Sequence, residues 1–132
     1  MDKNNNPLVT VGIPVFNGEK FMKRRLDSIL NQTYQNFQIL ISDNGSNDLT
    51  SKICEDYQKK ENKIKYYRQQ KNLGFVKNFN YLLKNTQTKY FVMAAVDDLW
   101  EPTFLEENIK ILELNKKIVG SIGNIKYFGY SG

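Results

Sequence analysis

The stretch YFVMAAVDD, residues 90–98, joins a run of apolar residues directly to two carboxylates, Asp97 and Asp98. An apolar run that begins with aromatic and β-branched residues is typical of a strand buried on both faces. Because a charged side chain is costly to bury, we expect the two aspartates at the solvent-exposed end of that strand. In an open parallel α/β sheet, this carboxyl end lies at the edge where ligands bind.

The two neighbouring aspartates can be interpreted in two ways. Hard oxygen ligands suit a divalent cation that carries phosphates, such as Mg2+ or Mn2+. The stretch 98–102, DLWEP, would also begin a helix well, because Asp is a favoured N-cap and Pro is favoured in the first turn. Asp97 and Asp98 alone leave both interpretations open.

Outward from this stretch, short apolar runs alternate with helical patterns. We expect strands at residues 8–13, 37–42, 64–68, 90–96 and 119–128, and helices at 18–32, 48–60, 75–84 and 102–114. Asn17 is the expected N-cap of the first helix. The third helix is expected to bury Phe75, Phe79, Leu82 and Leu83. The alternation predicts a three-layer α/β/α fold, in which a mostly parallel sheet with right-handed crossovers carries helices on both faces.

Length and composition indicate one globular domain. The chain has 132 residues, of which 40% are hydrophobic and 25% charged. Residues 1–7 are polar and are expected to form a flexible arm, and residues 8–132 the domain. No apolar stretch approaches the roughly 20 residues that span a bilayer. The start MDKNNNPL lacks the apolar segment of a secretory signal, so we expect a cytoplasmic protein.

Charge and residue usage narrow the chemistry. The chain has no histidine, which excludes imidazole metal sites and imidazole acid–base catalysis. The single cysteine, Cys54, falls in a helical pattern and is expected as a small packed residue. The net charge of +5 favours anionic partners such as nucleotides or the inner face of a membrane. The aromatic residues lie inside apolar runs and do not interleave with basic ones, so no nucleic-acid partner is expected.

Loops at the ends of the first two strands carry polar residues. In IPVFNGE, residues 13–19, Pro14 ends the strand and Asn17-Gly18 turns into a helix whose amides could meet a phosphate, or which is an ordinary turn. In DNGSND, residues 43–48, Ser46 or Asp48 serves as a helix cap. That leaves Asp43 free to bind a nucleobase N–H or ribose hydroxyls.

The loop after the third strand adds a turn and a cation. In QQKNLGFVKNFN, residues 69–80, Asn72 and Gly74 form a turn, and Gly74 suits a positive φ or a close backbone approach. Lys77 could reach a phosphate from the first turn of the next helix, or be a solvated lysine. The convergence of these loops on one edge indicates a binding site more strongly than any single loop does.

Taken in order, IPVFNGE, the block SILNQTYQNFQILISDNGSND, the NLG turn and the strand ending in VDD resemble family 2 glycosyltransferases of the GT-A fold, a Rossmann-like α/β/α architecture. The resemblance runs from about residue 8 over nearly the whole chain. It implies binding of a nucleoside-diphosphate sugar and inverting transfer of the sugar to a carbohydrate or lipid-linked acceptor, with a divalent cation, Mg2+ or Mn2+, on the diphosphate. It also implies polysaccharide biosynthesis, in the cytoplasm or at the inner face of the cell membrane.

The resemblance assigns roles by position. Nucleotide binding would fall to residues at the strand ends: Pro14, Val15, Asn17, Glu19, Asp43, Asn72, Gly74 and Lys77. Within that set Glu19 would contact the base or ribose, and Asp43 would hydrogen-bond the base. Asp97 would match the last carboxylate of the family's DxD metal motif, with Asp98 beside it.

Two positions depart from the family pattern. Ala95 stands where the first aspartate of DxD is usual, so Asp97 and Asp98 would have to carry the metal site together. Phe79 stands where the family has an arginine. Both are interpreted as variation within the family.

Catalysis would need a further residue. A general base must activate the acceptor hydroxyl, and the resemblance implies that this base comes from a later segment, beyond residue 132. We therefore expect the chain to be the donor-binding half of an enzyme, truncated at its C-terminus and inactive in transfer by itself. The alternative is a nucleotide-binding module without catalysis. A dinucleotide-binding domain is not expected, because IPVFNGE contains no G-x-G-x-x-G turn.

Overall fold

The computed structural model describes residues 6–124 and contains one parallel sheet. The strands are β1 (Val9–Val15), β2 (Phe37–Asp43), β3 (Ile64–Arg68) and β4 (Tyr90–Met93), and the helices are α1 (Glu19–Leu30), α2 (Thr50–Lys60), α3 (Phe75–Lys84) and α4 (Phe104–Leu114). The strand order is β3-β2-β1-β4, and every pairing is parallel.

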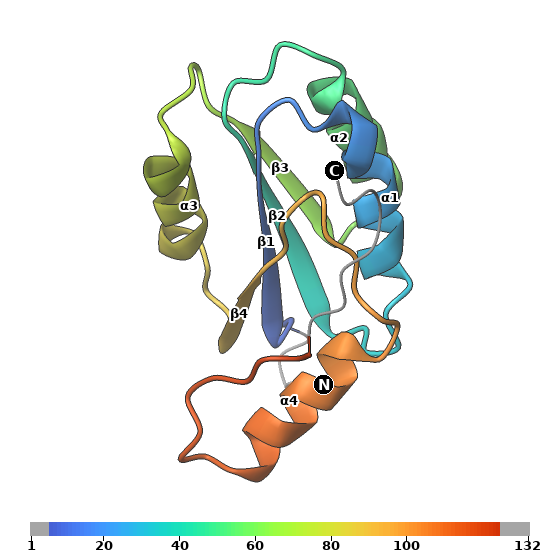
Figure 1. Cartoon of the computed structure of the whole chain (residues 1–132), viewed down its shortest axis with the longest axis vertical. Coiled ribbons are helices and arrows are strands. Elements are labelled where there is room, and N and C mark those ends of the chain that lie inside the picture. Colours follow the sequence, from blue (N-terminus) through green and yellow to red (C-terminus); the bar gives the residue numbers. More distant parts are fainter. Residues whose placement is uncertain (1–5, 125–132) are drawn as a thin grey trace.

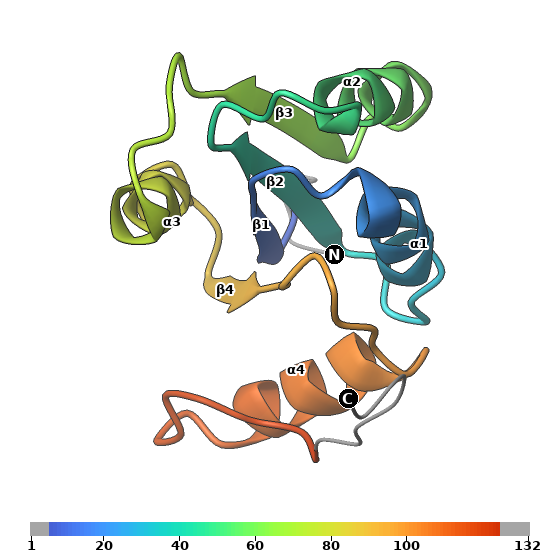
Figure 2. The same ribbon diagram turned by 45° about the horizontal axis from the view of Figure 1, so that its top comes forward.

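The helices cover both faces of this sheet. Figures 1 and 2 show α1 and α2 on one face and α3 on the other, while α4 lies beyond β4 at the lower end of both views. The three-layer α/β/α architecture predicted from the sequence is therefore confirmed. Among residues 6–124, no helix is both long and apolar enough to cross a bilayer.

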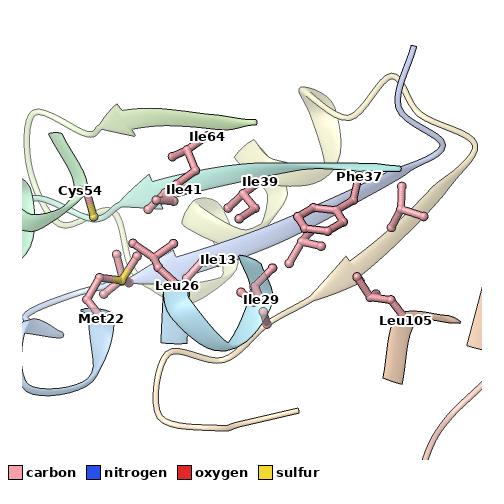
Figure 3. Close-up of a cluster of buried hydrophobic side chains, with 14 of the residues drawn as sticks. Ile13, Met22, Leu26, Ile29, Phe37, Ile39, Ile41, Cys54, Ile64 and Leu105 are labelled. Atoms are coloured by element: carbon pink, nitrogen blue, oxygen red, sulfur yellow. The ribbon is translucent and has the colours of Figure 1, made fainter. Parts of the chain in front are cut away.

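The core lies between the central strands and the helices. β1 is buried at every position, and β2 at all but one, because each has a strand on both sides and helices above and below. Met22, Leu26 and Ile29 of α1 pack against the isoleucines of β1 and β2, and Cys54 closes the cluster from α2 (Figure 3). The expectation of a packed Cys54 is confirmed, and burial raises the pKa of its thiol to about 12.

The strand around residue 90 is shorter and less buried than predicted. β4 ends at Met93; its first three residues are half-buried, and Met93 is 41% exposed. The reason is its place in the sheet: β4 pairs only with β1, from Tyr90 to Met93, and forms an edge of the described sheet. The prediction of one strand over residues 90–96, buried on both faces, is therefore wrong.

Three further expectations are corrected by the structure. Residues 119–124 form no strand, and the remainder of the predicted strand 119–128 lies outside the described residues. The N-cap of α1 is Gly18 and not Asn17. Phe75 and Leu83 are 62% and 43% exposed, because α3 turns Asn78 and Leu82 toward the sheet instead.

Candidate functional site

The carboxyl ends of three strands lie abreast at one edge of the sheet. Val15 of β1 stands opposite Asp43 of β2, which stands opposite Arg68 of β3. The ladder continues beyond the strands, because the Asn44 amide donates to the Val15 carbonyl and the Gln69 amide to the Asp43 carbonyl, both at 2.8 Å. The loops after β1, β2 and β3 therefore leave the sheet side by side, at the top of Figure 1.

Asn17 joins the loop after β1 to the loop after β2. Its amide donates to Ser46 Oγ at 2.8 Å, and its Oδ1 accepts from the Asn47 amide at 2.9 Å. Asn17 adopts a positive φ of 51°, a conformation that asparagine tolerates better than most residues. Its side chain therefore fixes the second loop instead of capping α1.

The start of α1 is also held by the loop after β2. The Gly18 amide donates to Thr50 Oγ1 at 2.9 Å, and the Glu19 amide to Asp48 Oδ2 at 3.2 Å. In return, Glu19 Oε2 accepts from the Leu49 amide at 3.0 Å. These amides have protein partners, which favours the ordinary-turn interpretation of the loop over a phosphate site on the helix.

Pro14 and Val15 occupy the last two positions of β1. Both are buried, and Val15 belongs to the hydrophobic core at 3% exposure. They lie in the interior of the sheet, directly before the turn that carries Asn17.

Asp43 ends β2 with a fully buried carboxylate. Its Oδ1 accepts from the Ser46 amide at 2.9 Å, and its Oδ2 accepts from the Tyr66 hydroxyl at 2.6 Å and from Ser51 Oγ at 3.5 Å. Burial and the bond to Asp43 both raise the pKa of the Tyr66 phenol. Asp43 therefore holds the loop after β2 in shape.

Asn72 and Gly74 belong to a turn tied to the neighbouring loop. The Asn44 side chain donates to Asn72 Oδ1 at 2.9 Å and accepts from the Leu73 amide at 2.8 Å. Gly74 has the predicted positive φ, 85°, and nothing lies within 4 Å of the place where a Cβ would stand. Conformation, and not close approach, therefore requires this glycine.

Two polar residues near this turn complete the edge. Lys77 is exposed in the first turn of α3. Arg68, which the sequence analysis did not single out, donates from Nη2 to the Ser46 carbonyl at 2.6 Å.

Asp97 and Asp98 lie in the segment that follows β4. The Ala94 amide makes a last bond to the Gly12 carbonyl at 2.8 Å, and the chain then leaves the sheet. Both aspartates are exposed, as predicted. A Cβ built on Gly18 would lie 3.2 Å from Val96 Cγ2, so the acidic segment touches the turn that follows β1. The structure thus brings the segments that carry Asn17, Asp43 and Asp97 to one edge.

The acidic pair does not begin the following helix. The N-cap of α4 is Thr103, five positions beyond Asp98. The segment between them is fixed by Gln32, whose Nε2 donates to the Glu101 carbonyl at 2.8 Å and whose Oε1 accepts from the Leu105 amide at 3.0 Å. The two carboxylates are therefore free of the capping role left open by the sequence.

Arg25 is a charged residue near the site that the sequence analysis missed. It lies on the buried face of α1 beside Met22, Leu26 and Ile29, and its side chain is fully buried. Its guanidinium stands 4.3 Å from the ring centroid of Trp100, two residues after Asp98. An arginine on the apolar stripe of a helix is the sequence signal that could have found it.

The donor set fits a divalent cation only in part. Within residues 6–124 no group of three or more His, Cys, Asp or Glu side chains converges on a metal position. Two exposed neighbouring carboxylates suit Mg2+ or Mn2+ when phosphate oxygens and water complete the shell, which is how Mg2+ is usually held in proteins. The residues therefore fit a cation shared with a bound diphosphate.

Comparison with known proteins gives one consistent family. The family model for glycosyl transferase family 2 matches residues 10–131. An uncharacterised glycosyltransferase of Haemophilus influenzae is 36% identical over 114 residues, which cover 86% of this chain and 35% of the relative. The chain therefore spans about a third of the length of this relative.

Solved structures show the same fold. S. aureus TarS (residues 1–349), solved in complex with UDP, matches with a TM-score of 0.74 at 25% identity, over 80% of this chain and 32% of that one. A Pyrobaculum calidifontis mannosyltransferase in complex with GDP-Man and Mn2+ matches with a TM-score of 0.75 at 22% identity, over 81% and 32%. The GT-A architecture is thereby confirmed, and the chain belongs to glycosyltransferase family 2.

Proposed function

We propose that this chain is the donor-binding part of an inverting, metal-assisted glycosyltransferase that acts on a nucleoside-diphosphate sugar. The observation that carries the proposal is the meeting of the segments after β1, β2 and β4 at one edge of a parallel sheet, in a chain of family 2. Open α/β sheets bind ligands at this edge. The acceptor would be a carbohydrate or lipid-linked hydroxyl.

The nucleoside would lie against the interlocked loops after β1 and β2. Pro14 and Val15 would form the floor, and Asn17 and Glu19 the wall. A base contact of Asp43 would require one of its present bonds to open. An incoming base N–H could take the place of a hydroxyl donor to Asp43, so the buried carboxylate would remain satisfied.

The diphosphate would lie between the turn after β3 and the acidic pair. Asn72 and Gly74 hold that turn, and the exposed Lys77 could extend toward a phosphate. Asp97 and Asp98 would hold the cation from the opposite side. When bound, the cation would stabilise the negative charge that develops on the leaving diphosphate.

The remaining parts of the reaction would come from outside these 132 residues. The chain spans 35% of the Haemophilus relative, so the general base and much of the acceptor site are assigned to the rest of a longer enzyme. We place this enzyme in the cytoplasm, where the net charge of +5 is compatible with peripheral contact at the inner membrane face.

A second candidate is a nucleotide-binding module without catalysis. Ala95 favours it, because a cation would have two adjacent carboxylates and no third from the same segment. Hydrolysis of a nucleotide sugar by the longer protein would separate the enzyme from the module.

Thermal unfolding with added nucleotides tests the proposal. A ligand that binds the folded state raises the free energy of unfolding by mass action, by about 2.7 kcal/mol at a ligand concentration 100 times its Kd. The midpoint temperature of unfolding rises with it. We expect a rise with UDP or GDP, a larger rise with Mn2+ added, and loss of the Mn2+ increment in Asp97→Asn/Asp98→Asn. Glu107→Gln on α4 is the matched control, and this variant should keep the additional rise caused by Mn2+.

Two results would contradict the proposal. If no nucleoside diphosphate raises the thermal midpoint, the chain does not bind the donor. If the midpoint rises equally with and without Mn2+, the acidic pair is not a cation site. The same follows if the additional rise with Mn2+ is unchanged in the Asp97/Asp98 variant.

A further inference from the structure

Arg25 is a buried cation on the inner face of α1. Its side chain has 0% exposure, and Nε, Nη1 and Nη2 find no acceptor among residues 6–124. Buried arginines are ordinarily paired, because an unpaired charge in the interior is strongly destabilising. Arg25 therefore calls for an explanation beyond packing.

The neighbours of Arg25 belong to the segment that carries the acidic pair. The guanidinium lies over the Trp100 ring at 4.3 Å, and the Trp100 amide lies 3.5 Å from Ser28 Oγ, one turn along α1. Burial lowers the pKa of Arg25 to about 10, and the negative charges of Asp98 and then Asp97 oppose that shift. The Arg25 guanidinium thus lies against the segment that carries the acidic pair, close enough for the charges of both aspartates to act on it.

The fold itself does not require a cation at this position. Met22, Leu26 and Ile29 share the same face of α1, and an unbranched apolar side chain such as methionine would fill the space of Arg25. Replacing buried charges by apolar residues of similar volume is often neutral or stabilising. A residue kept at a cost to stability next to a candidate site indicates a role in that site.

We propose that Arg25 is the built-in countercharge of the acidic pair: it acts as a positioning residue that holds the segment of Asp97 and Asp98 at the sheet edge when no divalent cation is bound. Trp100 keeps the guanidinium in place by stacking. The part that concerns the cation rests on the proposed function. The attraction between Arg25 and the aspartates does not.

This arrangement has a consequence for cation binding. Arg25 and a divalent cation act on the same two carboxylates, and like charges repel. Removing the Arg25 charge should therefore tighten cation binding, whereas loss of a purely structural residue would weaken it or leave it unchanged.

A double-mutant cycle without metal tests the countercharge. The variants are Arg25→Met, Asp97→Asn/Asp98→Asn and their combination, and the readout is the urea midpoint. We expect Arg25→Met to fold with a midpoint at or above that of the wild type. The aspartate substitutions should lower the midpoint with Arg25 present and have little effect with Met present.

Two results of the cycle would overturn the proposal. One is an equal effect of the aspartate substitutions in both backgrounds. The other is a midpoint of Arg25→Met far below those of the wild type and Arg25→Lys, because the charge would then support the fold itself.

Titration with Mn2+, followed by the fluorescence of Trp100, the single tryptophan, gives the second readout. Arg25→Met should bind Mn2+ at least about threefold more tightly than the wild type, and Arg25→Lys, which keeps the charge, within about twofold. Equal affinity of Arg25→Met and the wild type would contradict the proposal. Absence of Mn2+ binding in every variant would remove the proposed cation site, and the metal-free cycle would still decide the role of Arg25.

Discussion

The Tyr66 hydroxyl of β3 donates a 2.6 Å hydrogen bond to Oδ2 of the buried Asp43 at the end of β2. This bond ties the second strand at the candidate site to the strand beside it. Because Asp43 is inaccessible to solvent, no water can replace the hydroxyl without a change in the loop.

Tyr66→Phe should therefore destabilise the protein by about 1–3 kcal/mol, because the buried Oδ2 of Asp43 would keep only the long contact with Ser51. The urea midpoint measures this. Tyr67→Phe is the matched control, because Tyr67 is 44% exposed and stacks on Tyr81 through its ring. Equal midpoints for the two variants would show that the Asp43 carboxylate does not depend on Tyr66.

We expect Asp48 to make the free energy of unfolding depend on pH in the acid range. Burial would raise the pKa of Asp48, but hydrogen bonds from Thr50 and from the Glu19 amide outweigh burial and hold the pKa of this carboxyl below its ordinary value. A folded-state pKa below the unfolded value gives stability that is present above the unfolded pKa and lost as the pH falls through the folded pKa.

Asp48→Asn should lose less stability than the wild type between pH 6 and about pH 3, since it has no carboxylate to protonate. Urea midpoints at the two pH values measure the difference. Parallel losses in both proteins would contradict the assigned role of Asp48 in linking the loops after β1 and β2.

Gly45 and Gly74 share a backbone conformation but differ in the space around them, so substitutions at the two positions distinguish backbone strain from steric overlap. Both have positive φ, 78° and 85°. A Cβ on Gly45 would lie 3.0 Å from the Lys71 carbonyl carbon, whereas the space around Gly74 is open. Gly74→Ala should cost about 1–2 kcal/mol through φ alone, and Gly45→Ala clearly more. Equal urea midpoints would show that the loops after β2 and β3 are not in close contact.

Gln32, two residues after the end of α1, links this end of the helix to the chain that follows the acidic pair. Gln32→Ala removes both the donor to the Glu101 carbonyl and the acceptor for the Leu105 amide, and should destabilise by about 1–3 kcal/mol. Gln32→Glu keeps the acceptor for the Leu105 amide but buries a charge and sets a carboxylate oxygen against the Glu101 carbonyl, so it should destabilise at least as much as Gln32→Ala. Near-ultraviolet circular dichroism of Trp100 should weaken in the same order, and an unchanged signal in Gln32→Ala would contradict the link.

The central part of the fold could be predicted because its apolar residue patterns indicate burial directly. β1 and β2 are buried on both faces, so their apolar runs give strand and burial together. The prediction of burial on both faces was wrong for residues 90–96. Burial of an edge strand depends on which elements lie beside it, and the sequence of the strand does not contain this information. The expected burial of Phe75 was wrong because its ring lies 62% exposed and stacks on Phe79, which itself contacts Phe91 of β4.

The candidate site was predictable in place but not in detail. Parallel strands bring their carboxyl ends to one edge, so the gathering of Asn17, Asp43 and Asp97 followed from topology. The closure of Asp43 by Tyr66 depends on the register of β2 and β3, which residue patterns alone do not set. The burial of Arg25 was not predicted because arginine is ordinarily exposed, although its place on the apolar stripe of α1 was a signal for burial.

The central claim is that a nucleoside diphosphate and its cation bind at the edge formed by the segments after β1, β2 and β4. Paramagnetic broadening of backbone amide signals by substoichiometric Mn2+ in the presence of UDP or GDP tests it most directly. The amides of Gly18, Asp97 and Asp98 should broaden first. Broadening centred elsewhere, such as at Glu113 of α4, or no selective broadening at all, would contradict it.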